Sequence, residues 1–395
     1  MAVMKALRQL IRISAAPWAA ALLLSAALPA VAADVTVLSV RVMEGKLTDR
    51  VTIGAPGPLR VSFPGGAIEQ SRVTMTVDGP SVLILTYGDK TVRAPAPLTI
   101  TPVSEGTVLT VTAPGDQHRY RGGLTVSVEK GVIMLINTVP LEEYLLSVVP
   151  AELTTTEPAA LEAQAILSRT FATKNRRRHS GWDLCDLTHC QHYAGVDTET
   201  ALGTRAVKAT ERLIVTYDGA PAEVFYHSSS GGMITSPASV WGGSPVPYLV
   251  PVRDALNGRE LSGESPDFTW SFVVRREPLL AALSEAAGAP VTGITVTDRD
   301  PSGRAAKVRL AGVGREIMGE EFRIIVCRRF GWGSLKSTLF ELKEKDGSLR
   351  FDGKGLGHGV GMSQWGAVEL ARMGKDYRQI IDFYFPGTKV ERPVR

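Results

Sequence analysis

The residue with the clearest catalytic potential is Glu152, in the segment VVPAEL. It follows Pro150, which limits one predicted helix, and a second predicted helix with a face of small residues comes after it. A carboxyl group at such a junction can be shielded from water and still face a cleft. Under that condition it holds its proton near neutral pH and can donate it. Glu152 is therefore a candidate general acid, the alternative being an ordinary surface glutamate in a loop.

One carboxyl group is sufficient for one class of sugar-cleaving chemistry. Ordinary glycosidases use two carboxylates that flank the scissile bond. In a lytic mechanism a single acid protonates the leaving oxygen and then takes a proton from the substrate's own hydroxyl, which closes an anhydro ring. No second carboxylate is needed, because water is not the nucleophile. Four neighbouring acids are expected at helix starts or on exposed faces, in structural roles: Glu142, Glu143, Glu157 and Glu162.

Histidines and cysteines are concentrated between residues 179 and 192, with the residue types and spacing of a zinc site. The four candidate ligands are His179, Cys185, Cys190 and one of His189 or His192. A Cys185–Cys190 disulfide is an alternative, because exported proteins meet oxidants, and two unbonded thiols are another. The third cysteine, Cys327, lies in an apolar run and is expected to be a buried free thiol.

Two segments rich in glycine and polar residues, 225–232 and 355–367, are expected to line a groove that binds a sugar chain. The first contains a serine and a histidine, but adjacent strand residues point to opposite faces and the GxSxG context of a nucleophile is missing. The second lacks the Lys-Ser/Thr of a phosphate-binding loop, and a tight structural loop is its alternative. The predicted substrate-binding residues are Tyr226, His227, Ser228, Ser229, His358, Ser363, Gln364 and Trp365.

The elements that must position these residues predict an α+β fold. Residues 34–118 are short β-branched runs separated by turns, and they predict a β-rich accessory module. A hairpin is predicted over 124–137. A helix pair that carries Glu152 follows: the first helix runs from about Thr138 to Pro150, and the second from about Glu157 to Arg178.

The pattern after residue 205 is mainly that of strands. Residues 213–230 predict a strand, a turn and a strand, and residues 293–312 predict a hairpin that turns near Pro301–Gly303. The run FRIIVCRR (322–329) is expected to be a strand or another core segment. Residues 367–387 predict helices. No internal repeat of solenoid type is present.

The N-terminus has the order of a secretory leader over residues 1–33: three basic residues, an apolar run, then the small residues Ala30–Ala33. An uncleaved membrane anchor is the alternative. The whole chain carries a net charge of +4 and the leader +3, which leaves the mature chain near +1. Charge therefore gives no indication of a nucleic-acid partner. We expect an exported protein of the periplasm or cell wall, with no membrane span after leader cleavage.

Seven segments, in this order, resemble the stage II sporulation protein D and amidase-enhancer family of cell-wall proteins. They are YRGGLTV, INTVPLEEYLLSVVPAEL, EAQAILSRTFA, CDLTHCQHYAG, YHSSSGG, the SGR turn at 302–304 and GHGVGMSQWGA. Together they cover roughly residues 118–388. On this resemblance, residues 119–395 are expected to be the catalytic domain.

The resemblance implies a lytic transglycosylase that cuts peptidoglycan glycan strands between N-acetylmuramic acid and N-acetylglucosamine and leaves a 1,6-anhydro end. The family's catalytic glutamate, in a V-x-x-E-M context, corresponds to Glu152, with Leu153 at the methionine position. A zinc site is also implied, and His179, Cys185, His189 and Cys190 fit its pattern. The amidase-enhancer branch implies an alternative, a non-catalytic wall-binding activator of an N-acetylmuramoyl-L-alanine amidase.

Overall fold

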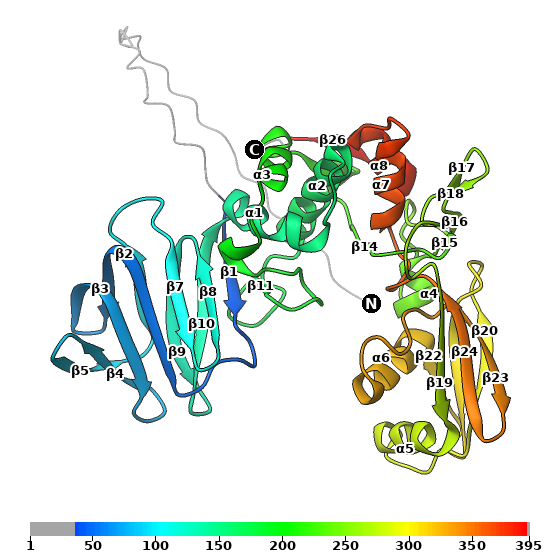
Figure 1. Cartoon of the computed structure of the whole chain (residues 1–395), viewed down its shortest axis with the longest axis horizontal. Helices are drawn as coiled ribbons and strands as arrows, with labels where there is room; N and C mark the ends of the chain where they lie inside the picture. The colour runs from blue at the N-terminus through cyan, green and yellow to red at the C-terminus, as the bar shows by residue number, and fades with distance from the viewer. Residues whose placement is uncertain (1–35, 393–395) are drawn as a thin grey trace, which may run out of the picture. The chain divides into compact units, whose positions relative to one another are not determined.

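The computed structural model describes residues 36–392, and the predicted leader over 1–33 lies outside this range. The described chain combines several sheets with helices, which confirms the predicted α+β class (Figure 1). Among these residues there is no helix with the length and apolar character needed to cross a bilayer.

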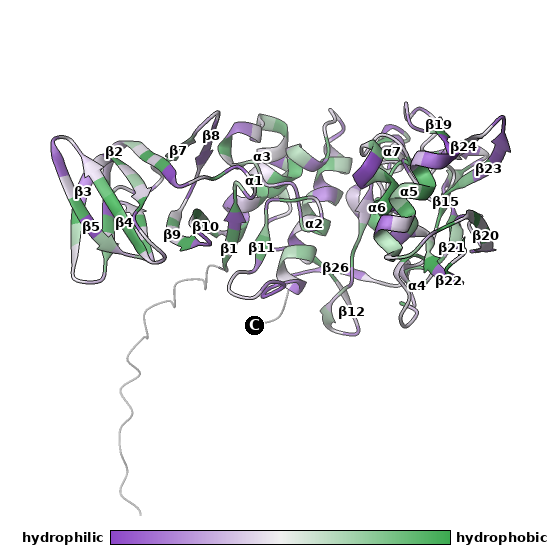
Figure 2. Cartoon of the chain, turned by 90° about the horizontal axis from the view of Figure 1, so that it is seen from below, coloured by the Kyte–Doolittle hydropathy of each residue, from purple (hydrophilic) through white to green (hydrophobic). Residues whose placement is uncertain are grey.

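The largest sheet has eleven strands, in the spatial order β11-β1-β10-β9-β6-β2-β3-β4-β5, with β7 pairing β2 and β8. Its strands are β1 Val37–Val42, β2 Arg50–Phe63, β3 Gly66–Val77, β4 Val82–Tyr87, β5 Lys90–Pro95, β6 Leu98–Pro102, β7 Leu109–Ala113, β8 Asp116–Tyr120, β9 Gly123–Glu129, β10 Val132–Pro140 and β11 Leu184–Cys185. β4 lies between β3 and β5 and is mainly apolar, whereas β8 pairs with β7 alone and is hydrophilic (Figure 2). Polar side chains are expected on such an edge strand.

The predicted accessory module shares this sheet with the chain that follows it. β1 pairs antiparallel with β10, and β6 pairs antiparallel with β9. β9 and β10 form the hairpin predicted over 124–137. Strands from both sides of residue 118 therefore belong to one sheet, and a division at 118/119 is a prediction about function, with no break in the sheet at that point.

The predicted helix pair is present as α1, Leu141–Glu152, and α2, Pro158–Lys174. α1 begins later than predicted because residues 138–140 remain in β10, paired with β1. Pro150 does not end the helix. It lies within its last turns, where a proline removes only one N–H donor, and Leu153 N–H still donates to the Val149 carbonyl at 3.0 Å. Glu152 is consequently the last helical residue of α1.

α2 is the central helix of the site and is buried along most of its length. It contacts α1, α3 (Ala201–Ala209), α7 (Gln364–Arg372) and α8 (Tyr377–Tyr384). The predicted small residues Ala165, Ser168 and Ala172 are buried and let these helices approach closely. Arg169, only 1% exposed, donates to both carboxylate oxygens of Glu142 at 2.8 Å and so fixes α2 against α1.

A second hydrophobic core lies within residues 269–354, called here the inserted subdomain. It contains two three-stranded sheets, β19-β24-β23 and β20-β21-β22, and two helices. Its elements are β19 Thr269–Arg275, α5 Arg276–Ala287, β20 Gly293–Arg299, β21 Ala305–Ala311, β22 Arg315–Met318, α6 Gly319–Phe330, β23 Phe340–Lys345 and β24 Ser348–Lys354. The sequence did not predict this separate core, although the hairpin predicted at 293–312 is present as β20–β21.

The run FRIIVCRR is helical and forms most of α6, so the expectation of a strand was wrong. Glu320 and Glu321 in the first turn, and Arg328 and Arg329 in the last, match the helix dipole and outweigh the β-branched residues. Cys327 on α6 is a buried free thiol, as predicted.

The remaining elements are short. They are the 3₁₀ helix Gly195–Thr198, β12 Ile214–Tyr217, β13 Ala220–Pro221, β14 Tyr226–His227, β15 Met233–Ile234, α4 Pro237–Trp241, β16 Val252–Arg253, β17 Ala255–Leu256, β18 Arg259–Glu260, β25 Met362–Ser363 and β26 Lys389–Glu391. β12 and β13 form the predicted hairpin, and the predicted C-terminal helices are α7 and α8. β14 and β25 pair in parallel and thereby place the two glycine-rich segments side by side.

Candidate functional site

Glu152 ends α1 with a partly buried side chain. Its Oε1 accepts a hydrogen bond from the His192 N–H at 2.6 Å. Burial raises the pKa of Glu152, while the His192 N–H and the Tyr226 hydroxyl partly oppose that shift. The negative end of the α1 dipole also disfavours the charged form. The environment therefore favours a protonated carboxyl group that is held in a fixed orientation.

Gln191 connects Glu152's surroundings into a buried polar network. Its amide nitrogen donates to the Tyr226 hydroxyl at 3.0 Å, and its amide oxygen accepts from the Tyr144 hydroxyl at 3.2 Å. Burial, and then the charge of Glu152, raise the pKa of Tyr226, so the phenol stays protonated. The network fixes this hydroxyl beside the carboxyl group.

Two other glutamines hold the backbone of Glu152. Gln364, at the start of α7, donates from Nε2 to the Glu152 carbonyl at 2.9 Å and lies 3.4 Å from Gln164 Oε1. Gln164 on α2 is fully buried and donates to Ser168 Oγ at 3.1 Å. Gln164 and Gln191 were not predicted. Gln164 carried a signal, since it is a lone amide among small and apolar neighbours, but such an amide also suits an ordinary buried hydrogen bond. Gln191, between Cys190 and His192, carried none.

Of the eight predicted substrate-binding residues, Tyr226 and Gln364 are brought to Glu152. His227 follows Tyr226 on β14 and so points to the opposite face of that strand. Its ring centroid lies 5.5 Å from that of His358, and the Trp241 ring centroid lies 5.1 Å from that of His358. Burial is the first cause that lowers the pKa of both imidazoles, that of His358 to about 3. The two histidines are therefore neutral and form a cluster separate from Glu152.

The other four predicted residues contact the main chain of the two glycine-rich segments. They are Ser228, Ser229, Ser363 and Trp365. Ser363 Oγ caps α7 by accepting from the Gly366 N–H at 3.3 Å. Trp365 is partly buried, and its main-chain N–H donates to the Ser228 carbonyl at 3.1 Å. Ser229 is fully buried and bridges to Leu356 through its main chain. Contact of these residues with a sugar stays a prediction.

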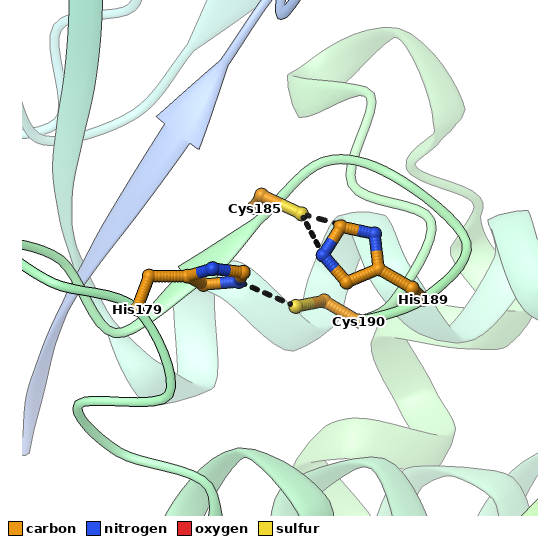
Figure 3. A group of neighbouring side chains, drawn as sticks. All are labelled: His179, Cys185, His189 and Cys190. Carbon is orange, nitrogen blue, oxygen red and sulfur yellow. Dashed lines mark hydrogen bonds between the residues drawn. The ribbon is translucent and has the colours of Figure 1, made fainter.

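His179, Cys185, His189 and Cys190 converge, as Figure 3 shows. Their ligand atoms all lie within 4.8 Å of one another. Cys190 Sγ is 3.2 Å from His179 Nε2, and Cys185 Sγ is 3.3 Å from His189 Nε2. A tetrahedral zinc ion with usual bond lengths sets its sulfur and nitrogen ligands about 3.6 Å apart. Both cysteines are free, so the structure has no Cys185–Cys190 disulfide.

The donor set of two thiols and two imidazoles suits zinc, and the two sulfur–nitrogen distances given above lie near the expected spacing. The hydrogen bond between the two thiols lowers the pKa of Cys190, with a further contribution from His179, and raises the pKa of Cys185. His192, the alternative fourth ligand, is exposed and outside the cluster, and its N–H donates to Glu152.

The loop over residues 185–192, called here the cysteine-histidine loop, links the large sheet to Glu152. Cys185 lies on β11, which pairs with β1. Cys190 directly precedes Gln191 and His192, which contact Tyr226 and Glu152. Whatever fixes the four side chains of this cluster also fixes the donor that orients the Glu152 carboxyl group.

Comparisons with known proteins agree with these motifs. A family model described as stage II sporulation protein matches residues 129–217, which contain Glu152 and the cluster. A second model, described as a domain of unknown function (DUF8618), matches residues 258–361, which contain the inserted subdomain.

Three curated relatives are similar over most of the described chain. The stage II sporulation protein D of Bacillus amyloliquefaciens is 31% identical over 277 residues, which are 65% of this chain and 75% of the relative. That of Bacillus subtilis (strain 168) is 30% identical over 65% of this chain and 75% of the relative. The amidase enhancer of Bacillus subtilis (strain 168) is 26% identical over 58% of this chain and 37% of the relative. The chain belongs to the stage II sporulation protein D family.

Proposed function

We propose that this protein is a lytic transglycosylase that cleaves peptidoglycan glycan strands between N-acetylmuramic acid and N-acetylglucosamine, with Glu152 as general acid and then general base. The observation that carries the proposal is the environment of Glu152. It is a partly buried carboxyl group with a raised pKa, oriented by the His192 N–H and placed beside the Tyr226 hydroxyl. A group of that kind is protonated at a higher pH than an ordinary glutamate and can act as an acid.

The proposed reaction needs no second carboxylate. Glu152 gives its proton to the glycosidic oxygen, and the bond from that oxygen to C1 of the muramic acid breaks. The ionised Glu152 then accepts the proton of the C6 hydroxyl as its oxygen bonds to C1, which forms the 1,6-anhydro ring and restores the acid. Glu142 lies at the opposite end of α1 from Glu152 and is paired with Arg169.

A second candidate is a non-catalytic, wall-binding activator of an N-acetylmuramoyl-L-alanine amidase. The similarity to the amidase enhancer of Bacillus subtilis favours it. The two proposals differ in what they require of Glu152, because a protein that only binds needs no buried acid at this position.

Digestion of peptide-free glycan strands, followed by mass spectrometry of the ends, tests the proposal. We expect anhydro ends from the wild type and a loss of about 10²- to 10⁴-fold in Glu152→Gln, the usual value of a general acid-base group. Glu162→Gln is the matched control, because burial, and then Asp376, also raise the pKa of this partly buried glutamate on α2. It should keep full activity.

Three other results would contradict the proposed transglycosylase activity. Ends that carry an added water indicate hydrolysis. Equal losses in the Glu152 and Glu162 variants indicate a general effect of removing a partly buried acid. No release from glycan, combined with stimulation of a purified amidase, indicates the activator.

We further propose that His179, Cys185, His189 and Cys190 hold one structural zinc ion. When bound, zinc supplies a cross-link between β11 and the loop that precedes His192. The chain's own residues then do the rest: the loop holds the His192 N–H against Glu152 Oε1 and the Gln191 amide against the Tyr226 hydroxyl.

A further inference from the structure

The Arg304 side chain extends from the inserted subdomain to the segment that follows Tyr226. It lies directly after the β20–β21 turn and is 1% exposed. Its Nη2 donates to the Ser230 carbonyl at 2.7 Å and to the Met233 carbonyl at 3.1 Å. These carbonyls belong to the segment that follows Tyr226 on β14.

The turn that presents Arg304 is held in one conformation. Asp300 Oδ1 accepts from the Ser302 N–H at 2.9 Å and from the Arg304 N–H at 3.0 Å. The other carboxylate oxygen of Asp300 accepts from the Thr235 hydroxyl. The turn thus contacts the 228–235 segment at two points, the Arg304 guanidinium and the Asp300 carboxylate.

The guanidinium also packs against the second glycine-rich segment. A Cβ added to Gly359 would lie 2.4 Å from Arg304 Cζ, closer than real contacts allow, and Gly359 has a φ of +80°. The Gly359 carbonyl accepts from the Thr235 N–H at 2.8 Å. Arg304 therefore lies where residues 228–235 and 356–361 meet, and the glycine leaves room for it.

Both segments lead directly to groups that contact Glu152. Tyr226 precedes the first and interacts with the carboxyl group, and Gln364 follows the second and donates to the Glu152 carbonyl. β14 and β25 pair through Tyr226 and Met362, so a shift of either segment moves both groups.

An arginine is an expensive choice for simple packing at this place. Among residues 36–392, two of its donors, Nε and Nη1, are buried without a partner, and no carboxylate hydrogen-bonds its guanidinium. Burying a charge or a donor without a partner costs free energy, which an apolar side chain of similar size avoids. What an apolar side chain lacks is the pair of hydrogen bonds that fixes the Ser230 and Met233 carbonyls.

We propose that Arg304 is a positioning residue through which the inserted subdomain holds Tyr226 and Gln364 against Glu152. The effect on activity rests on the proposed function, whereas the effect on the two segments does not. The inserted subdomain is then a part of the active-site scaffold, and its β20–β21 turn is the contact that matters.

Amide hydrogen exchange on the full mature chain, together with the glycan assay, tests this proposal. Arg304→Met should increase exchange in residues 228–235 and 356–364, lower kcat by about 10- to 100-fold as expected for a displaced group, and change KM little. Arg304→Lys should recover part of the protection from exchange and part of kcat, because an ammonium group can still donate to the carbonyls.

Arg276→Met is the matched control. Arg276 begins α5 in the same subdomain, donates to the Thr292 carbonyl and pairs with Glu344, and both partners lie within the inserted subdomain and outside the β20–β21 turn. This variant should leave exchange in the two segments and kcat unchanged. If it acts like Arg304→Met, or if Arg304→Met leaves the two segments as protected as in the wild type, the proposal is wrong.

Two further results separate this proposal from others. If Arg304→Met does not fold, Thr235→Val keeps the arginine and removes the second contact of the turn, and it should loosen the same segments to a smaller extent. Unchanged exchange in that variant would overturn the proposal. If the wild type releases no anhydro ends, the proposed function fails, and the exchange measurements still decide the role of Arg304.

Discussion

The acid strength of Glu152 depends on opposing local effects. Burial and the end of α1 favour the neutral carboxyl group, while the His192 N–H and the Tyr226 hydroxyl favour the carboxylate. Burial is the largest of these, so the pKa is raised. The same donors give the ionised form a partner after proton transfer, which a residue that acts first as acid and then as base requires.

This balance predicts how stability responds to pH. Because the folded pKa of Glu152 lies above the unfolded value, the folded protein binds more protons between the two, and stability falls as pH rises through that window. Glu152→Gln carries no charge and should be more stable than the wild type at pH 8. The difference should disappear below about pH 4, where an unfolded glutamate is also protonated. Urea denaturation at both pH values measures it.

Glu142, also on α1, provides a control in which loss of the carboxylate should have the opposite effect on stability. Glu142→Gln leaves the buried guanidinium of Arg169 without its carboxylate and should destabilise the protein at pH 8. A Glu152→Gln variant that is less stable than the wild type at pH 8 would mean that the carboxylate, and not the acid, is the favoured form.

At the residue scale, the sequence predicted the groups with distinctive chemistry. Glu152 and the four members of the cysteine-histidine cluster are identifiable by residue type and spacing, and the structure brings the four together. His227 lies beside His358 and not beside Glu152, because the alternation of β14 turns it away from Tyr226, and contact of either histidine with a sugar stays a prediction. Gln191 has no pattern of its own, and only the fold reveals its contacts.

At the element scale, the short loop between β11 and His192 is the most sensitive part of the site. It has little regular structure, and its two ends are fixed by β11 pairing with β1 and by the His192–Glu152 bond. The cluster of His179, Cys185, His189 and Cys190 joins those ends. Without a metal, weak hydrogen bonds between thiols and imidazoles are what hold these four side chains together.

Zinc removal is therefore expected to loosen the loop and stop the reaction. The purified protein should contain one zinc per chain by elemental analysis. Chelation or Cys185→Ser should lower Tm by roughly 5–10 °C, given the stabilisation of a tightly bound ligand in a domain of this size. Cys327→Ser is the control, because this buried thiol lies outside the cluster. Full zinc content in Cys185→Ser, or unchanged activity after complete chelation, would contradict the proposal.

Elements with a strong periodic pattern were predictable, and those decided by competing effects were not. The β9–β10 and β20–β21 hairpins follow from β-branched runs around a turn. α6 contains the same kind of run, but charges suited to both helix ends make it helical. The end of α1 depends on Pro150, which the helix tolerates because only one hydrogen bond is lost.

At the scale of the whole molecule, long-range pairing determines which parts belong together. The pattern of short strands before residue 118 predicted β structure but could not say which strands β1 and β6 would pair with. They pair with β10 and β9, across the predicted boundary. The inserted subdomain was missed for a similar reason, because its strands and helices look like those around them and only the contacts define a second core.

This shared sheet predicts that residues 119–395 cannot fold as the intact chain does. Removing the residues before 119 strips β1 from β10, and with it the fully buried side chains of Leu38, Val40 and Val42. At about 1.5–3 kcal/mol for each buried side chain, the loss approaches the 5–15 kcal/mol by which a typical domain is stable. We expect the truncated chain to aggregate or to lack a cooperative unfolding transition, whereas residues 34–395 remain monomeric with one. Size-exclusion chromatography and thermal denaturation of the two chains compare them directly. A soluble 119–395 chain with a wild-type Tm would show instead that the earlier strands form an independent module that only leans on the sheet.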